Sequence, residues 1–266
     1  MNTLTGMPRE INGEVDRKFV EALARGLDIL RAFNPGDGFL GNQEIAQRTG
    51  LPKSSISRLT YTLTSLGYLT YSKRLEKYQL GAGVLALGYA FVSNLGIRQV
   101  ANPQMKELSI ETGTSIGLAD RDRLDMIYVD HCAPKDIVTF KKDIGDKIPM
   151  ATTAAGRAYL VALSEEERDF FLRHFKEKLG DKFDAVKVGI DQALESYKEF
   201  GYCHSWGDWE RDTNAIAVPL KLTQGQIYVF NAGGPAFRLS KEFLAGEVAP
   251  QLKSMVRNIE ATLIQF

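Results

Sequence analysis

The sequence predicts an α+β protein that begins with a winged helix-turn-helix and continues into a separate domain of mixed strands and helices. Residues 41–67 read as two short helices around a glycine turn, and two aromatic-rich strands follow them. After residue 96, strands and helices mix without Rossmann alternation, and 266 residues suffice for two cores. We expect a flexible arm at 1–16, the winged helix-turn-helix at 17–81, a linker helix at 82–96 and the α+β domain at 97–266.

The first expected helix runs from Phe19 to Phe33 and ends at the turn-forming segment 34–38, Asn-Pro-Gly-Asp-Gly. Apolar residues at helical spacing predict its buried face. These are Val20, Leu23, Ala24, Leu27 and Leu30.

The helix-turn-helix follows directly. Asn42 is suited to cap its first helix, and Gly50 to take the left-handed conformation that ends it. Pro52 fits the start of the second helix. A buried stripe is expected on that second helix, formed by Ile56, Leu59, Leu63 and Leu66.

The outward face of the second helix has hydroxyls and one cation but no acidic group, which suits entry into a DNA major groove. The expected strands 68–71 and 77–80 enclose a basic tip that forms the wing. Solubility alone explains many basic hairpin tips, but the adjacent recognition helix favours DNA contact. The predicted DNA-binding residues are Asn42, Lys53, Ser54, Ser55, Ser57, Arg58, Tyr61, Thr62, Lys73, Arg74 and Lys77.

Charge is unevenly distributed along a chain whose formal net charge is zero. Residues 41–80 hold six cations and two anions, a balance of +4 in the segment that contains the helix-turn-helix. A basic patch of this kind favours nucleic acid as a partner only because it coincides with that motif. A helix-turn-helix used for protein contact alone is disfavoured by the non-acidic outward face.

Several fragments of this N-terminal part resemble IclR-type bacterial transcriptional regulators in order and spacing. They are Ala24–Phe33, Glu44–Ala46, Ser57–Leu59, Leu66–Leu69 and Tyr78–Gly81. The resemblance implies a DNA-binding regulator that acts as a homo-oligomer, dimer or tetramer. Paired recognition helices would then read half-sites about 34 Å apart.

Residues 81–96 form an apolar helix that needs a partner surface. In the family that this chain resembles, the equivalent helix links the domains and helps to pair protomers. Its predicted oligomerisation residues are Val84, Leu87, Phe91 and Leu95. Packing of this stripe onto its own domain is the alternative.

The remaining elements are expected from local patterns, including a capping box that begins at Ser164 and a closing helix bent at Pro250. The expected helices include 103–111, one that follows residues 149–158, 190–200 and 240 onward. The expected strands are 114–119, 124–130, 137–141, 215–220 and 226–230, with a turn at 120–123.

This second half is also similar to the IclR family, through segments 153–158, 200–202, 215–219 and 233–235. The resemblance implies a GAF-like domain that binds a small effector. The chain departs from the family pattern at Asn214–Ala215 and at Asn231–Gly233. The effector site implied by the resemblance comprises Met126, Tyr128, Met150, Thr153, Ala154, Ala155, Ser205, Trp206, Ala215, Ala217, Asn231 and Gly233.

The expected effector is a small organic acid. Backbone N–H groups at the helix start near Ala154 favour an anion, and Trp206 offers a ring for stacking. Packing of the tryptophans on the domain's own core is the alternative. The segment Phe19–Gly26 is similar to the subgroup that controls catabolism of aromatic acids, which suggests a planar carboxylate.

Enzyme function is the weaker hypothesis, with the α+β domain as a hydrolase and the helix-turn-helix as a docking module. The three histidines lie outside any recognisable catalytic context. His131–Cys132 and Cys203–His204 lack the spacing of a structural zinc site, so we expect neither metal nor cofactor.

We expect a cytoplasmic protein, because the N-terminus has no signal-peptide pattern, no run of about 18 apolar residues occurs and two distant cysteines do not suggest a disulfide framework. The sequence therefore predicts a ligand-responsive regulator of a catabolic operon, with the sign of regulation left open.

Overall fold

The computed structural model describes residues 10–11, 14–15, 18–134 and 142–264. The chain forms two compact units, and their boundary lies between Leu95 and Gly96. In the segment expected to be a flexible arm, the described residues form two short strands, β1 (Glu10–Ile11) and β2 (Glu14–Val15), which pair antiparallel.

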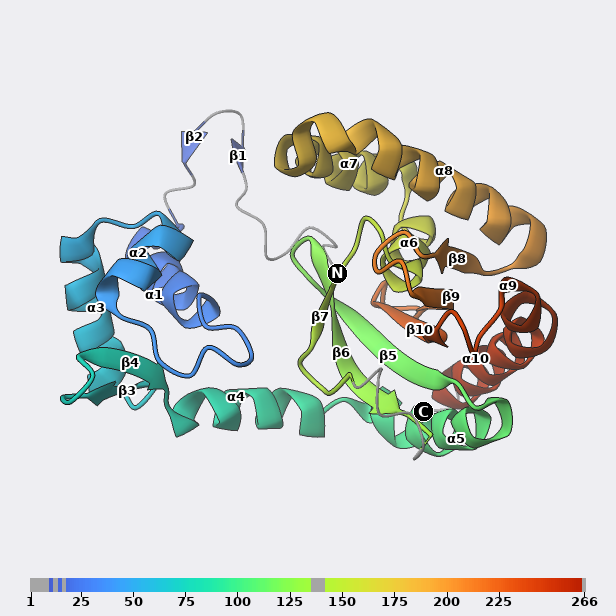
Figure 1. Cartoon of the computed structure of the whole chain (residues 1–266), viewed down its shortest axis with the longest axis horizontal. Helices are drawn as coiled ribbons and strands as arrows, with labels where there is room; N and C mark the ends of the chain where they lie inside the picture. The colour runs from blue at the N-terminus through green and yellow to red at the C-terminus, as the bar shows by residue number, and fades with distance from the viewer. Residues whose placement is uncertain (1–9, 12–13, 16–17, 135–141, 265–266) are drawn as a thin grey trace. The chain divides into compact units, whose positions relative to one another are not determined.

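The first unit is a winged helix-turn-helix followed by one further helix (Figure 1). Its elements are α1 (Glu21–Arg31), α2 (Asn42–Thr49), α3 (Lys53–Ser65), β3 (Leu69–Ser72), β4 (Lys77–Leu80) and α4 (Ala82–Ser93). Each of the first three helices, the first strand of the wing and the segment before α2 contributes a residue to one core. These residues are Ile29, Leu40, Ile45, Ile56 and Leu69, all at most 3% exposed. Burial on this scale stabilises the unit by about 1.5–3 kcal/mol per side chain.

The turn between α2 and α3 forms as expected, whereas the cap of α2 does not. Gly50 ends α2 at φ 70° and donates its N–H to the Ala46 carbonyl. Gly41, rather than Asn42, is the N-cap of α2. The Glu44 carboxylate accepts from the Gly41 N–H at 2.6 Å, so the side chain that stabilises the start of α2 is that of Glu44, which binds the backbone of the N-cap residue.

The predicted buried face of α1 is wrong at three of its five residues, whereas Leu30 packs against the core as expected and Ala24 is half-buried. Val20, Leu23 and Leu27 are 61%, 63% and 48% exposed, because α1 turns Gly26 and Ile29 toward the core. The apolar residues of α1 cover more than one face, so their spacing alone cannot identify the side that packs.

The stripe predicted on α3 also needs one correction. Ile56 is buried and Leu59 and Leu63 are half-buried, but Leu66 is 64% exposed because α3 ends at Ser65. Thr60 lies in the core instead, where its hydroxyl donates to the Ile56 carbonyl at 2.8 Å.

Helix α4 contains no buried residue among those described, although it is largely apolar. Leu85, Leu87, Tyr89 and Phe91 are between 48% and 74% exposed. No single described helix is long and apolar enough to cross a membrane, and α4 meets that test only when joined to α5 across the break at Asn94–Leu95.

The second unit is a three-layer α+β domain around one six-stranded antiparallel sheet with the order β7-β6-β5-β10-β9-β8. Its strands are β5 (Ser115–Asp122), β6 (Asp125–Cys132), β7 (Lys147–Pro149), β8 (Cys203–Trp206), β9 (Thr213–Lys221) and β10 (Ile227–Pro235). Its helices are α5 (Gly96–Thr112), α6 (Ala154–Ala162), α7 (Glu165–Leu179), α8 (Phe183–Phe200), α9 (Lys241–Phe243) and α10 (Ala249–Ile264). The short turns η1 (Gly180–Lys182) and η2 (Leu244–Val248) precede α8 and α10.

Several boundaries in this unit differ from those expected. Helix α5 begins at Gly96 and contains Pro103, and α8 begins at Phe183 rather than residue 190. Strands β5 and β6 continue through the expected turn at 120–123, since Asp122 pairs with Asp125 and Arg123 takes φ 59°. Strands β7 and β8 were not expected, and the predicted strand 137–141 lies outside the described residues.

The expected end signals for helices in this unit are present. Ser164 forms a capping box with Glu167, and Gly201 ends α8 at φ 77°. The helix break expected at Pro250 is a π-helical turn, η2, which lies directly before α10.

Helices α6 and α10 lie on opposite faces of the sheet (Figure 1). Helix α6 contacts β8, β9 and β10, and its first three residues are Ala154, Ala155 and Gly156. A Cβ atom added at Gly156 would lie 2.0 Å from the Met150 carbonyl oxygen, so only glycine permits this approach. The start of α6 is thereby held directly against the segment that follows β7.

We expect Gly156→Ala to destabilise the second unit by about 3 kcal/mol, because the overlap involves backbone atoms that cannot rotate away. Thermal unfolding followed by circular dichroism measures this. Gly26→Ala is the matched control, since a Cβ atom there meets nothing within 4 Å in a helix interior. A melting temperature for Gly156→Ala equal to that of the wild type would contradict the packing described.

Candidate functional site

The outward face of α3 has the polar character expected of a recognition helix. Ser54, Ser57, Arg58 and Thr62 are exposed, and Ser55 is half-buried. Tyr61 is 74% exposed and projects the largest side chain from this face. The hydroxyls of Ser57 and Thr62 donate back to the carbonyls of Lys53 and Arg58, which leaves their oxygen lone pairs as acceptors.

Asn42 lies beside this face from the preceding helix. Its side-chain amide donates to the Ser57 hydroxyl at 3.4 Å, a long contact, and its Oδ1 atom is buried without a partner among the described residues. The structure therefore brings the predicted residue Asn42 to the recognition helix, although not as a helix cap.

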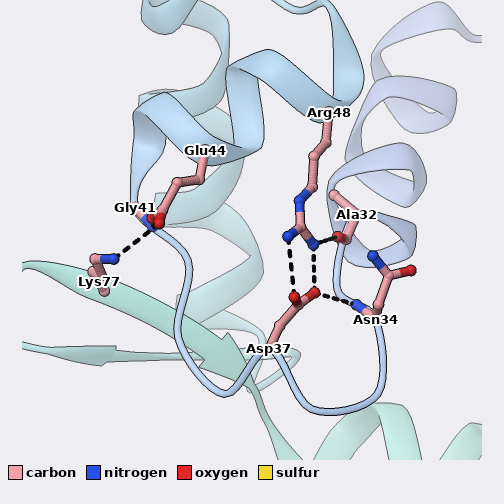
Figure 2. Close-up of polar contacts among 7 residues, drawn as sticks. All are labelled: Ala32, Asn34, Asp37, Gly41, Glu44, Arg48 and Lys77. Atoms are coloured by element: carbon pink, nitrogen blue, oxygen red, sulfur yellow. Dashed lines mark hydrogen bonds and ion pairs between the residues drawn. The ribbon is translucent and has the colours of Figure 1, made fainter.

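Two ion pairs hold α2 in place from opposite ends (Figure 2). The Arg48 guanidinium donates to the Ala32 carbonyl at 2.8 Å and to both carboxylate oxygens of Asp37. The Asn34 N–H also donates to Asp37, and these bonds lower the pKa of that carboxyl group below its ordinary value. The end of α1, the connecting turn and α2 are thus joined by a single guanidinium.

At the other end, the Lys77 ammonium lies 3.0 Å from the Glu44 carboxylate, which also caps α2 (Figure 2). The Gly41 N–H and Lys77 together lower the pKa of Glu44. Lys77, predicted to meet a DNA phosphate, is therefore paired within the protein.

Of the six cations in residues 41–80, Arg48 and Lys77 form ion pairs within the first unit. Lys53, Arg58, Lys73 and Arg74 are exposed, and none of them has an ion pair within the described part of the chain. Two lie on α3 and two at the tip of the wing, Lys73–Glu76, where Glu76 takes φ 53°. These four side chains form the basic surface of the first unit.

In the second unit, the structure brings most of the predicted effector residues together on the face of the sheet that α6 covers. Met126, Tyr128, Met150, Ala154, Ala155 and Ala217 belong to one buried cluster, with Ala215 packed against it. Gly233 and Asn231 pair with Ala215 and Ala217 across strands and so share their face. Small side chains make up much of this surface opposite the start of α6.

Unpartnered polar atoms lie on the same face. Asn231 Oδ1 and Ser115 Oγ are buried without a hydrogen-bond partner among the described residues. Burial raises the pKa of Tyr128 to about 12, because its surroundings disfavour the charged phenolate. Gly117 leaves room for both, since a Cβ atom there would lie 2.3 Å from the Tyr128 ring and 2.6 Å from Asn231.

The hydroxyls of the two other polar residues predicted for this site are engaged within the protein. Thr153 Oγ1 accepts from the Gly156 N–H at 3.1 Å and donates to the Pro149 carbonyl. Ser205 Oγ donates to the Thr152 carbonyl at 3.0 Å. Both residues thus fix the start of α6 against β7 and β8.

Trp206 does not share a wall with Ser205, which corrects the predicted arrangement. Adjacent residues of β8 point to opposite faces, and Ser205 is buried on the side of α6. Trp206 stacks on the His204 ring, with centroids 4.8 Å apart, and lines an open groove of about 800 Å³ beside α8. None of the other predicted effector residues lines that groove.

Trp209 is the second tryptophan of the segment after β8. It packs against the buried cluster under α6, and the Lys142 ammonium lies 4.7 Å from its ring centroid. Within the ranges that the structure describes, no group of three His, Cys, Asp or Glu side chains is arranged to hold a metal ion.

A winged helix-turn-helix with a basic, non-acidic recognition surface, joined to a separate α+β domain, defines a DNA-binding regulator by its architecture. Two family models match the chain, the IclR helix-turn-helix domain over residues 22–73 and the bacterial transcriptional regulator IclR C-terminal domain over residues 89–261. The chain belongs to the IclR family of bacterial transcriptional regulators.

Similar proteins agree with this assignment. The regulator TsaQ1/TsaQ2 of Comamonas testosteroni is 34% identical over 92% of this chain and 88% of its own length. The Pca regulon regulatory protein of Pseudomonas putida is 25% identical over 92% of this chain and 84% of its own length. These relatives are transcriptional regulators, so the alternative hypothesis of a hydrolase finds no support.

Solved structures share the fold. An IclR family regulator from Brucella abortus superposes with a TM-score of 0.87 at 46% identity, covering 93% of this chain and 94% of that one. An IclR homologue from Microbacterium hydrocarbonoxydans, solved with 4-hydroxybenzoate, has a TM-score of 0.71 at 21% identity, covering 92% and 100%. The latter likeness concerns the fold alone.

Proposed function

We propose that this IclR-family regulator controls a catabolic operon in response to a small organic acid bound under α6. The observation that carries the proposal is the pair of buried, unpartnered oxygens, Asn231 Oδ1 and Ser115 Oγ, on a sheet face lined by small side chains. Because its partner is chromosomal DNA, we infer that it acts in the cytoplasm.

For DNA recognition, we propose that Ser54, Ser55, Ser57, Arg58 and Tyr61 of α3 face the major groove. Lys53, Lys73 and Arg74 then meet phosphates on either side. Lys77 makes a weaker contribution than these three, because Glu44 already neutralises it. Arg58 is the side chain in this set best suited to bidentate recognition of a guanine.

Arg58→Ala should cost about 1–3 kcal/mol of binding free energy and relax sequence preference, as expected for loss of a base contact. Lys73→Ala should weaken binding to all duplexes alike and flatten the salt dependence. Gel-shift titrations at several salt concentrations, on selected and random duplexes, separate the two. Equal loss on both duplexes for Arg58→Ala would make Arg58 a phosphate contact instead.

We further propose that the protein is a homo-oligomer whose protomers pair through α4, with Leu87 and Phe91 at the contact and Val84 and Leu95 at its edges. The exposure of Leu87 and Phe91, 59% and 48%, supports this arrangement. Leu23 and Leu27 of α1 add a second exposed apolar surface in the same unit. Exposed apolar side chains in this number favour a protein partner over water.

Phe91→Asp should shift the mass measured by light scattering toward the monomer, because it introduces a charge into the proposed contact. Leu75→Asp is the matched control, since Leu75 is 41% exposed at the wing rather than on α4. A Phe91→Asp variant that keeps the mass of the wild type would overturn the role of α4 in assembly.

In the effector site, we propose that the acid group binds near the backbone N–H groups at the start of α6. A hydroxyl or similar donor on the ligand would satisfy Asn231, whose unpaired oxygen otherwise costs about 1–3 kcal/mol. An aromatic hydroxy acid offers both groups on one rigid frame. Trp206 is not part of this proposed site.

Ala154→Leu should abolish binding of the preferred acid, because it fills the anion end of the site. Isothermal titration calorimetry with a panel of aromatic and aliphatic carboxylic acids provides the measurement. Trp206→Ala is the control and should bind with wild-type affinity. If Ala154→Leu folds normally and binds the best acid of the panel unchanged, the site lies elsewhere.

A further inference from the structure

A groove runs beside the recognition helix, and α1 forms its other side. Its volume is about 780 Å³, and its lining includes Glu21 and Arg25 of α1 together with Arg58 and Tyr61 of α3. From the sequence, we expected α1 only to pack against the core. The structure instead places the first turns of α1 beside the surface that meets DNA.

Glu21 and Arg25 form an ion pair one helical turn apart along the edge of this groove. Their side chains are 68% and 40% exposed, so both remain accessible. Among the residues that line the groove, Glu21 is the only acidic one, while Arg25 and Arg58 are both cationic.

We propose that Arg25 is a DNA phosphate contact and that Glu21 holds it in the free protein. When α3 occupies a major groove, a helix packed beside it lies next to the sugar-phosphate backbone that borders the groove. A phosphate oxygen accepts from a guanidinium as a carboxylate does. Glu21 therefore occupies the position that the phosphate takes in the complex.

The exchange has a defined energetic consequence. Binding breaks an exposed ion pair, which is worth little in water, and forms a charge-assisted bond to a phosphate. Glu21 thus lowers affinity for every duplex, and it does so only through Arg25.

The experiment uses fluorescence anisotropy with a pool of labelled duplexes of random sequence, about three helical turns long, and with the duplex that the wild type enriches from that pool. Arg25→Ala should weaken binding about tenfold and reduce the salt slope by about one unit per protomer bound. Glu21→Gln should tighten binding about two- to fivefold, which corresponds to the loss of one exposed pair.

The double variant isolates the proposed link between the two residues. In the Arg25→Ala background, Glu21→Gln should change affinity by less than twofold, since the pair it would release is already gone. Glu177 and Lys178 are exposed on α7 of the second unit. The control variants Lys178→Ala and Glu177→Gln make the same changes of charge there and should leave affinity for DNA unchanged.

Two results would overturn the proposal. If Arg25→Ala keeps wild-type affinity and salt slope while its circular dichroism melt is also unchanged, Arg25 does not contact phosphate. If Glu21→Gln tightens binding equally with and without Arg25, Glu21 acts by direct repulsion of the DNA phosphates and does not hold Arg25. Arg25→Lys should retain most of the salt slope, which separates loss of charge from a disturbed helix.

Discussion

The approach of α6 to the sheet is the constraint on which the second unit depends. Ala154, Ala155 and Gly156 bring the helix backbone so close that a single methyl group at Gly156 would overlap Met150. The same approach places Arg157, 2% exposed, under β8, where its guanidinium donates to the His204 carbonyl and to Asp208. The edge strand and the turn after it are therefore fixed by one helix.

That constraint also explains why the sheet face under α6 is composed of small residues. Ala215, Ala217 and Gly233 offer little side-chain volume where the helix start lies opposite them. Packing of this density needs no polar atoms, and buried polar groups are normally paired. The proposed ligand site rests on the two unpartnered oxygens in this place.

Local patterns were sufficient to predict the helix-turn-helix, the wing, the capping box at Ser164 and the glycine that ends α8. Each of these signals acts within a few residues, so the sequence alone contains its cause. Strand β8 escaped prediction because its four residues, Cys203–Trp206, read as part of a polar loop. Without knowing that they form a strand, we could not assign Ser205 and Trp206 to opposite faces.

Long-range pairing set the second limit on prediction. Arg48 pairs with Asp37 eleven residues away, and Lys77 with Glu44 across 33 residues. A count of charges in the segment treats these cations as equal to Lys73 and Arg74, although only the latter two have no ion pair among the described residues. The buried face of α1 could not be identified from the sequence either. Val20, Leu23 and Leu27 are as apolar as the residues of α1 that pack against the core.

Two features bear on how a regulator of this kind works. The first unit exposes apolar side chains on α1 and α4, and the second buries the Asn231 and Ser115 oxygens without partners on the sheet face under α6. A second protomer suits the former and a small polar ligand the latter. Regulation requires that binding of the ligand and pairing of the protomers be coupled, typically by about 1–3 kcal/mol of free energy.

Strand β6 is the element through which we expect this coupling to pass. Its residue Tyr128 lies in the buried cluster under α6, while Asp130, 3% exposed, is bound on the other face by Asn102 at 3.1 Å and Arg98 at 3.4 Å. Both partners belong to α5, which follows α4 after only Asn94 and Leu95. We propose that a ligand which favours one position of β6 would act on α5 through this buried carboxylate, whose bonds cannot be exchanged for water without cost.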